Sequence, residues 1–341
     1  MRFRLLIVAS VSLINFPAFA QVFGGNPASL KWKQINTDTV RVIFPEGLSQ
    51  QAERLTNVIQ YLNKHEQKSS GSREFKLNLV LQNQTLISNG YVALAPFRSE
   101  FQITPSQESF QLGSENWLDF LATHEYRHAL QNMNFDKGFS HFMRILFGQA
   151  GQSFATDMAV PNWFWEGDAV FMETALGRQG RGRLPSFYDQ FRGLYFEHKN
   201  YSWLKMRNGS LKDEVPDYYH LGYLLCAFGR QKFGDTLWEN VTNDAVRFKG
   251  IIYPFSKSLK KNTGMKMIPF YHAMLQYYGD KWKADTARTI HYEIKNVTTA
   301  KKHFIDREYP VFISKDSLLF LQYSYKKTPA ICLMNSTWKI I

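Results

Sequence analysis

The chain has 341 residues, of which 44% are hydrophobic and 21% are charged, so a wholly disordered protein is excluded. Two cysteines are too few for a disulfide framework or a cysteine-rich zinc finger. The formal net charge of +12 comes from scattered basic residues without a nucleic-acid motif, so we expect no nucleic-acid partner. No apolar run reaches the roughly 18 to 20 residues of a transmembrane segment.

Residues 1–20 have the pattern of a secretory signal peptide. Two arginines precede a short apolar stretch from Leu5 to Ile14, and alanines at 18 and 20 fit positions −3 and −1 of a cleavage site. We therefore expect cleavage before Gln21 and export of the mature chain to the periplasm or cell envelope. We also expect that any binding partners of the chain are components of the cell envelope.

Residues 21–115 read as an α+β sheet subdomain. Alternating or apolar runs predict strands at 40–44, 76–81, 91–94 and 101–103. Apolar residues at helical spacing predict a helix over 48–62. The strand that starts at 91 is equally compatible with an ordinary sheet strand and with one that pairs with an extended peptide at a cleft edge.

Residues 116–305 read as a helical subdomain, because apolar residues recur at a period near 3.6. Its second helix, dense in Phe, Ile, Leu and Met over 139–147, suits core packing better than a lid or a membrane-surface contact. Cys226 lies in an apolar run and is expected in the core, while a bridge from Cys226 to Cys332 stays open.

Residues 306–341 change to a strand, turn, strand pattern, with a third strand at 330–334. This segment is shorter than one propeller blade, which needs about 40 residues. We expect a partial β-propeller blade here, the start of a truncated propeller.

The segment from Thr123 to His128 contains the motif H-E-x-x-H within a helical apolar pattern. Ser114 or Asn116 would cap this helix. His124 and His128, one turn apart, can each offer a nitrogen to one Zn²⁺ ion. Glu125 can then act as the general base that takes a proton from the attacking water.

A catalytic zinc site needs a third protein ligand. Glu166 is the candidate, because it lies in the first turn of a helix predicted from Pro161 to Gly177 and has three aromatic neighbours. Glu173 follows on the same face and suits either a hydrogen bond to a ligand histidine or an ordinary salt bridge. Tyr219 is our candidate for stabilising an oxyanion, with His220 as the alternative.

The H-E-x-x-H motif followed by the aromatic-rich W-x-x-E-G motif resembles the gluzincin metallopeptidases, in particular the aminopeptidase N clan. The resemblance implies His124, His128 and Glu166 as zinc ligands, Glu125 as general base, Glu173 as the downstream acid and Tyr219 as the transition-state tyrosine. The G-x-M-E-N strand of the aminopeptidases is missing, so the resemblance does not extend to exopeptidase specificity.

A longer resemblance covers nearly the whole predicted mature chain. FGGNP at 23–27, NTDTVRVIFPEG at 36–47, NGYVALAPFRSEF at 89–101, HEYRH, VPNWFWEGDAVFMET and QGRGRLP are similar to the N-terminal peptidase-like region of exported bacterial TolB-like (WD-repeat-like) β-propeller proteins.

Together these features predict an α+β, gluzincin-like (zincin) domain, with a mixed sheet subdomain before a helical one. The expected function is zinc-dependent hydrolysis of a peptide or protein substrate. Two alternatives remain open. One is a non-catalytic zincin-fold module that serves as a binding or assembly platform for a propeller, and the other is hydrolysis of a non-peptide amide or ester at the same site.

Overall fold

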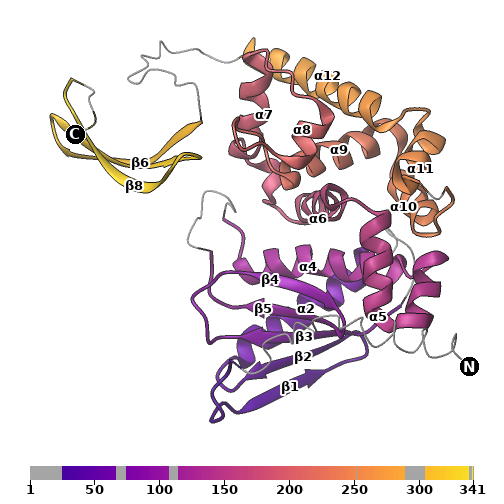
Figure 1. Ribbon diagram of the computed structural model, residues 1–341. Coiled ribbons are helices and arrows are strands. Elements are labelled where there is room, and N and C mark those ends of the chain that lie inside the picture. The colour runs from indigo at the N-terminus through magenta and orange to yellow at the C-terminus, as the bar shows by residue number, and fades with distance from the viewer. Residues whose placement is uncertain are drawn as a thin grey trace, which may run out of the picture.

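The computed structural model describes residues 25–66, 74–106, 114–250, 252–288, 304–337 and 340. The predicted signal peptide and its cleavage site lie outside these residues. Within them the chain is a mixed α+β protein with one five-stranded mixed sheet and one three-stranded antiparallel sheet (Figure 1). The α+β class expected from the sequence is therefore confirmed.

The N-terminal sheet has the strand order β1-β2-β3-β5-β4, in which β2, β3 and β5 run parallel and the two outer strands antiparallel. Its strands are β1 (Trp32–Asn36), β2 (Val40–Pro45), β3 (Leu77–Gln82), β4 (Gly90–Leu94) and β5 (Phe97–Gln102). Four of these match predicted strands, with β5 starting earlier than expected. The mostly exposed β1 was not predicted.

Apolar residues alternate along the central strands, and this explains how the sheet buries one face. Val40, Val42, Leu77, Leu79 and Leu81 are all fully buried, because side chains two residues apart on a strand point to the same side. Helix α2 (Ser49–Glu66) covers β2 with its apolar stripe, and α4 (Trp117–Asn134) packs on α2, β4 and β5. One hydrophobic core joins the sheet, α2 and most of α4.

A second core fills the helical region that lies above α4 in Figure 1. Its helices are α5 (Phe139–Ala159), α6 (Asn162–Leu176), α7 (Ser186–Phe196), α8 (Trp203–Asn208), α9 (Tyr218–Phe233), α10 (Leu237–Val246), α11 (Pro254–Thr263) and α12 (Met267–Thr286), with the 3₁₀ turn η2 (Arg181–Arg183) after α6. Helix α6 packs on α4 from one side and on α9 from the other, so it joins the two cores.

The prediction that the apolar segment 139–147 packs in the core is wrong. Phe142, Ile145 and Phe147 of α5 are 51%, 67% and 63% exposed. The side that α5 does bury carries small or polar residues, among them Gly151 and Ala155. At Gly151 the second half of α5 packs against the first across a kink at Phe147 and Gly148, and an added Cβ would lie 2.4 Å from the Met143 carbonyl oxygen.

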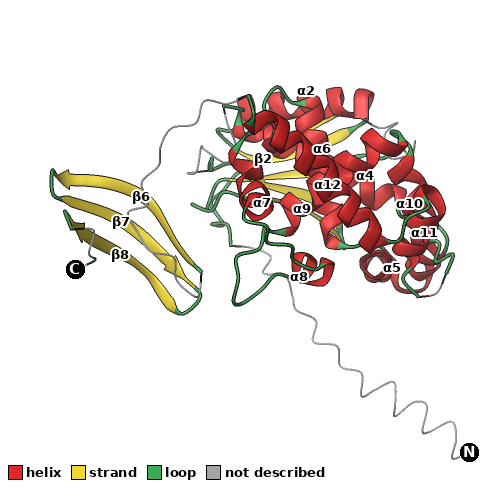
Figure 2. Cartoon of the chain, turned by 90° about the horizontal axis from the view of Figure 1, so that it is seen from above, coloured by secondary structure: helices red, strands yellow, loops and turns green. Residues whose placement is uncertain are grey.

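The C-terminal sheet is a meander of β6 (Ile305–Ser314), β7 (Ser317–Ser324) and β8 (Lys327–Asn335), with β7 in the middle. It lies to one side of the helices in Figure 2. The predicted strand, turn, strand, strand pattern at 306–341 is confirmed.

The two cysteines are unbridged, and Cys226 is fully buried in the helical core, as expected. Among the described helices, none has the combination of length and apolar character that crossing a bilayer requires.

Candidate metal centre

Helix α4 places the two histidines. Asn116 caps it, as one of the two predicted caps, because its side-chain oxygen accepts a hydrogen bond from the backbone N–H of Leu118 at 3.0 Å. His124 and His128 then follow one turn apart on the side of α4 that faces α6. His124 is buried and His128 half-buried, so neither is on a solvated helix face.

Helix α6 places the carboxylate. It begins after Pro161 and ends at Gly177, as the sequence predicts. Gly167 packs against Gly222 of α9, and a Cβ at either position would overlap the backbone of the facing helix. This close crossing fixes α6 between α4 and α9, with Glu166 pointing at the two imidazoles.

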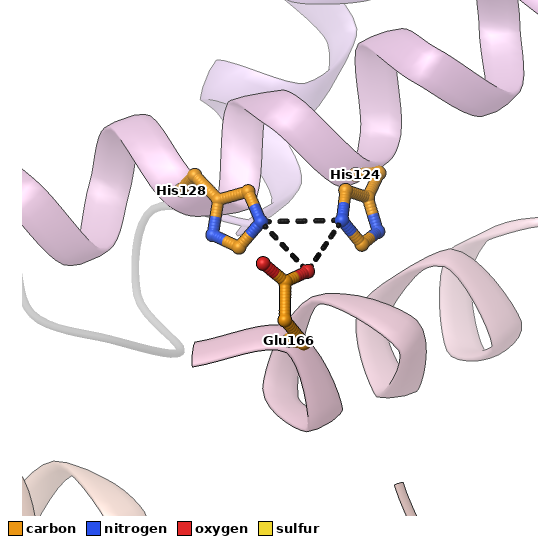
Figure 3. Close-up of side chains that lie close together, drawn as sticks. All are labelled: His124, His128 and Glu166. Carbon is orange, nitrogen blue, oxygen red and sulfur yellow. Dashed lines mark hydrogen bonds and ion pairs between the residues drawn. The ribbon is translucent and has the colours of Figure 1, made fainter. Parts of the chain in front are cut away.

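Three ligand atoms from these helices converge (Figure 3). Oε2 of Glu166 lies 3.1 Å from Nε2 of His124 and 3.3 Å from Nε2 of His128. The two Nε2 atoms are 3.1 Å apart. All three residues meet the geometry of a group that could hold a metal ion.

The other nitrogen of His124 is held by Glu173. Nδ1 of His124 donates to Oε2 of Glu173 at 3.0 Å. Arg181 pairs with the same carboxylate, with Nε 2.7 Å from Oε1 and Nη2 3.0 Å from Oε2. Glu173 therefore hydrogen-bonds a candidate ligand histidine and also forms a salt bridge, so it combines the two roles that the sequence left open.

The other nitrogen of His128 is held by Gln131, a residue that the sequence analysis missed. The Gln131 amide donates to the Trp165 carbonyl at 3.1 Å and to Oδ2 of Asp168 at 3.0 Å. Its Oε1 is thus left to accept a hydrogen bond from Nδ1 of His128, at 2.8 Å. The spacing of Gln131 from His128 could have suggested this contact, because residues three apart on a helix are neighbours.

These contacts fix the tautomers of both histidines. With Nδ1 of each ring donating, each Nε2 points to the same place as the Glu166 carboxylate and can offer a lone pair there once it is deprotonated. Three acceptor atoms that face one another repel unless a proton or a cation lies between them. Two imidazoles and one carboxylate are a donor set that suits Zn²⁺, so the residues present fit the ion expected from sequence.

Charge reinforces this arrangement. Burial disfavours protonation of His124, but hydrogen bonds to Glu166 and Glu173 outweigh it and raise the pKa of His124 to about 9. Burial also disfavours ionisation of Glu166, but the two histidines hold the pKa of its carboxyl far below its usual range. Glu166 is therefore a permanent anion at neutral pH.

Glu125 lies beside His124, His128 and Glu166, but its carboxyl is less completely hydrogen-bonded than that of Glu166. Its side chain is 5% exposed, and its Oε2 has no hydrogen-bond partner among the residues that the structure describes. Burial raises the pKa of Glu125, although the neighbouring histidines counteract part of the effect. Gly90 of β4 packs on the Glu125 side chain, where an added Cβ would lie 3.3 Å from its Cγ.

Of the two candidates on α9 for stabilising an oxyanion, Tyr219 lies at the cavity and His220 does not. Tyr219 lines the same cavity as the triad, and its ring is 6.3 Å from that of His124. Burial raises the pKa of Tyr219, so its hydroxyl stays protonated and able to donate. His220 instead hydrogen-bonds Asp217 at 2.6 Å and stacks on Phe187, and it does not line the cavity.

The cavity above these residues has a volume of about 540 Å³. Its walls come from β4, α4, the second half of α5, the start of α6 and the start of α9. Arg181, from η2, also lines it and lies over the Tyr219 ring at 5.1 Å. The sequence pointed to Arg181 only as part of QGRGRLP and assigned it no role.

A buried ionic cluster of Asp168, Arg127 and Arg230 lies next to the candidate metal centre. Asp168 accepts from Nε of Arg127 at 2.6 Å and from Nη2 of Arg230 at 3.0 Å. Because Asp168 also accepts from Gln131, the cluster is connected to His128 through one side chain. Arg127 lies within the H-E-x-x-H motif and points away from the cavity, toward Glu66 and Asp168.

Comparison of the chain with known protein families and with curated protein sequences gave no match.

Proposed function

We propose that this chain is an exported, zinc-dependent, peptidase-like hydrolase of the gluzincin type. The observation that carries the proposal is the convergence of Nε2 of His124, Nε2 of His128 and Oε2 of Glu166, each 3.1 to 3.3 Å from the others. The same three residues would hold the ion. Their outer partners, Glu173 and Gln131, are already hydrogen-bonded in the orientation that a ligand histidine needs.

Bound Zn²⁺ would supply a Lewis acid that polarises a carbonyl and makes water easier to deprotonate at neutral pH. Glu125 would take that proton, because its carboxyl lies next to the triad and burial raises its pKa, which makes the carboxylate a stronger base. The same carboxyl would then give the proton to the leaving amine.

Tyr219 would hydrogen-bond the oxygen on which negative charge develops. Its hydroxyl remains protonated, and Arg181 lies over its ring from one side. A donor held in place before the reaction needs little reorganisation as the charge appears.

A peptide substrate is supported by β4. This strand lies at the edge of the sheet, paired with β5 on one side, and Gly90, Tyr91, Val92 and Leu94 line the cavity. An extended peptide can add to such an edge as a further strand. The backbone hydrogen bonds that hold it do not depend on the identity of its side chains. The geometry thus favours the cleft-edge role over a plain sheet strand.

The wider proposal also includes the family relationship. The mixed sheet followed by the H-E-x-x-H helix and the W-x-x-E-G helix supports a gluzincin fold. The meander β6–β8 supports a partial blade of a TolB-like propeller. Location in the periplasm or cell envelope, and partners there, rest on the signal-peptide pattern of residues 1–20.

Replacing Glu125 by Gln tests this proposal. Zinc content would be measured by mass spectrometry of the metal, and cleavage with a peptide library. We expect Glu125→Gln to retain one zinc per chain and to lose hydrolysis by at least about a hundredfold, the usual contribution of a general base. Glu53→Gln, on the exposed side of α2, is the matched control and should behave as wild type.

A Glu125→Gln variant as active as wild type would remove this residue from the mechanism. If the wild-type chain binds zinc stoichiometrically and cleaves no peptide, the non-catalytic binding module is favoured. A parallel screen of ester and non-peptide amide substrates separates that outcome from hydrolysis of another substrate class.

A further inference from the structure

Helix α5 consists of two helical segments that meet at a kink at Phe147 and Gly148, and both segments expose large apolar side chains. Seven of these side chains, each more than a third exposed, are here called the outer face of α5: Phe139, Phe142, Ile145, Leu146, Phe147, Phe154 and Met158. Exposed apolar residues are ordinary when scattered, but seven of them within the 20 residues from 139 to 158, on two adjoining helical segments, mark a contact surface. The inward side of α5 is made instead of small and polar residues.

A strongly basic segment adjoins this helix. Residues 247–266, here called the basic segment, contain six Lys or Arg residues and no Asp or Glu. All six cationic side chains are exposed: Arg247, Lys249, Lys257, Lys260, Lys261 and Lys266. Asp244 pairs with two of them, Lys249 at 3.0 Å and Lys261 at 2.6 Å, so the excess of positive charge remains large.

Large apolar residues are interleaved with these cations. Ile252 and Tyr253 are 65% and 76% exposed, and Ile268, two residues after the segment, is 52% exposed. The basic segment is thus a mixture of positive and apolar groups.

Contacts at both ends of α5 make the two features one surface. At its N-terminal end, the ring of Phe139 lies 4.7 Å from that of Phe248, and Gly138 packs on Arg247. At its C-terminal end, Met158 shares the lining of a mostly apolar cavity of about 660 Å³ with Tyr253, Lys266 and Ile268. Figure 1 shows α5 directly below α10 and α11 on the same flank of the molecule.

We propose that the outer face of α5 and the basic segment together dock on an anionic lipid surface. Large apolar side chains can enter the boundary between headgroups and acyl chains, while clustered Lys and Arg are attracted to negative headgroups. This attachment is peripheral, in keeping with the lack of a spanning helix among the described residues.

Charge argues against a second copy of the chain as the occupant. A two-fold dimer through this surface would bring the same patch of each copy together, so both basic segments would lie in one interface. Like charges so placed repel, whereas an anionic bilayer neutralises them. The proposal does not depend on the proposed hydrolase activity.

The test is co-sedimentation of the purified mature chain with vesicles, either of pure phosphatidylcholine or of phosphatidylcholine containing phosphatidylglycerol. We expect at least about tenfold stronger binding to the anionic vesicles, weakened by high salt because surface charges are screened. The double variant Ile145→Ser/Leu146→Ser should lower binding at least about tenfold, since the lost apolar contact is a main source of affinity.

Two further variants make the result specific. Lys257→Glu/Lys260→Glu should remove most of the preference for anionic vesicles. Leu86→Ser, in the loop before β4 and 91% exposed, is the matched apolar control and should bind as wild type. All substituted side chains are exposed, and circular dichroism would verify that each variant is folded.

The proposal is overturned if wild type binds neither kind of vesicle, or if Leu86→Ser weakens binding as much as the variant in α5. It is also overturned if sedimentation velocity shows a dimer that Ile145→Ser/Leu146→Ser dissociates while vesicles are not bound. That result would assign the surface to contact between two copies.

Discussion

Nδ1 of His128 donates a hydrogen bond to Oε1 of Gln131, three residues later on α4, over 2.8 Å. Because the Gln131 amide is committed to Trp165 and Asp168, its oxygen cannot be exchanged for its nitrogen without losing both contacts. Gln131 therefore fixes one tautomer of His128. The result is an Nε2 lone pair aimed at His124 and Glu166.

Removing this hydrogen bond should weaken metal binding. Gln131→Leu is expected to lower zinc affinity by about 10- to 100-fold, the usual effect of losing the partner of a ligand histidine. Competition with a chromophoric chelator measures the affinity, and thermal unfolding of the metal-free proteins measures any general loss of stability. Wild-type zinc affinity in Gln131→Leu would show that His128 does not need this partner.

Zinc affinity should also rise with pH. The pKa of His124 is raised to about 9 in the metal-free protein, so at pH 7 a proton occupies the position that a metal needs. Zinc must displace it, and the apparent association constant should increase about tenfold per pH unit for each proton released, from pH 7 until the pKa is passed. Chelator competition at several pH values checks this. An affinity that is constant from pH 7 to 9 would contradict a protonated His124.

The crossing of α6 and α9 should tolerate no side chain at its closest point. Gly222→Ala would push a methyl group into the Trp163 carbonyl, so we expect a loss of about 1–3 kcal/mol or more in the free energy of unfolding. Urea denaturation measures it. Gly193→Ala is the matched control, because Gly193 lies in α7 with open space around it, and Ala should be neutral or stabilising by up to about 1 kcal/mol. Equal effects at the two positions would contradict the packing argument.

Asp168 should be far more important to stability than an exposed aspartate. Burial opposes its ionisation, but Arg127 and Arg230 lower the pKa of Asp168 to about 2. Asp168→Asn leaves two buried cations without their carboxylate and should cost about 3–5 kcal/mol at pH 7. Because the folded pKa lies below the ordinary value of 3.8, this stabilisation is complete above pH 3.8 and is lost as the pH falls through 2.

The matched control for Asp168 is Asp119, which pairs with Arg54 at the surface. Asp119→Asn should cost less than about 1 kcal/mol, since exposed ion pairs contribute little. Urea denaturation of both variants at pH 7 gives the comparison. Similar losses would show that the buried cluster is not a main source of stability.

Much of the candidate site could be predicted because its signals are local. The spacing of His124 and His128, the cap at Asn116 and the helix limits at Pro161 and Gly177 depend on residues within a few positions of each other. The role of Tyr219 was harder to predict from sequence, because its position at the cavity depends on the packing of α9 against α6.

The parts that could not be predicted depend on tertiary packing. The apolar residues of α5 have the spacing of a core helix, but α5 is kinked at Phe147 and Gly148 and buries small or polar residues instead, which leaves the large residues outside. Arg181 reaches the cavity only because the chain turns back after Gly180, which has a φ of 56°. Strand β1 was missed because most of its side chains are exposed.

X-ray absorption at the zinc edge of the mature chain tests most directly whether His124, His128 and Glu166 share one zinc ion. We predict a shell of nitrogen and oxygen ligands at about 2.0–2.2 Å with the scattering of two imidazoles and no sulfur, lost or changed in Glu166→Ala. A sulfur ligand, or a spectrum that Glu166→Ala leaves unchanged, would contradict it.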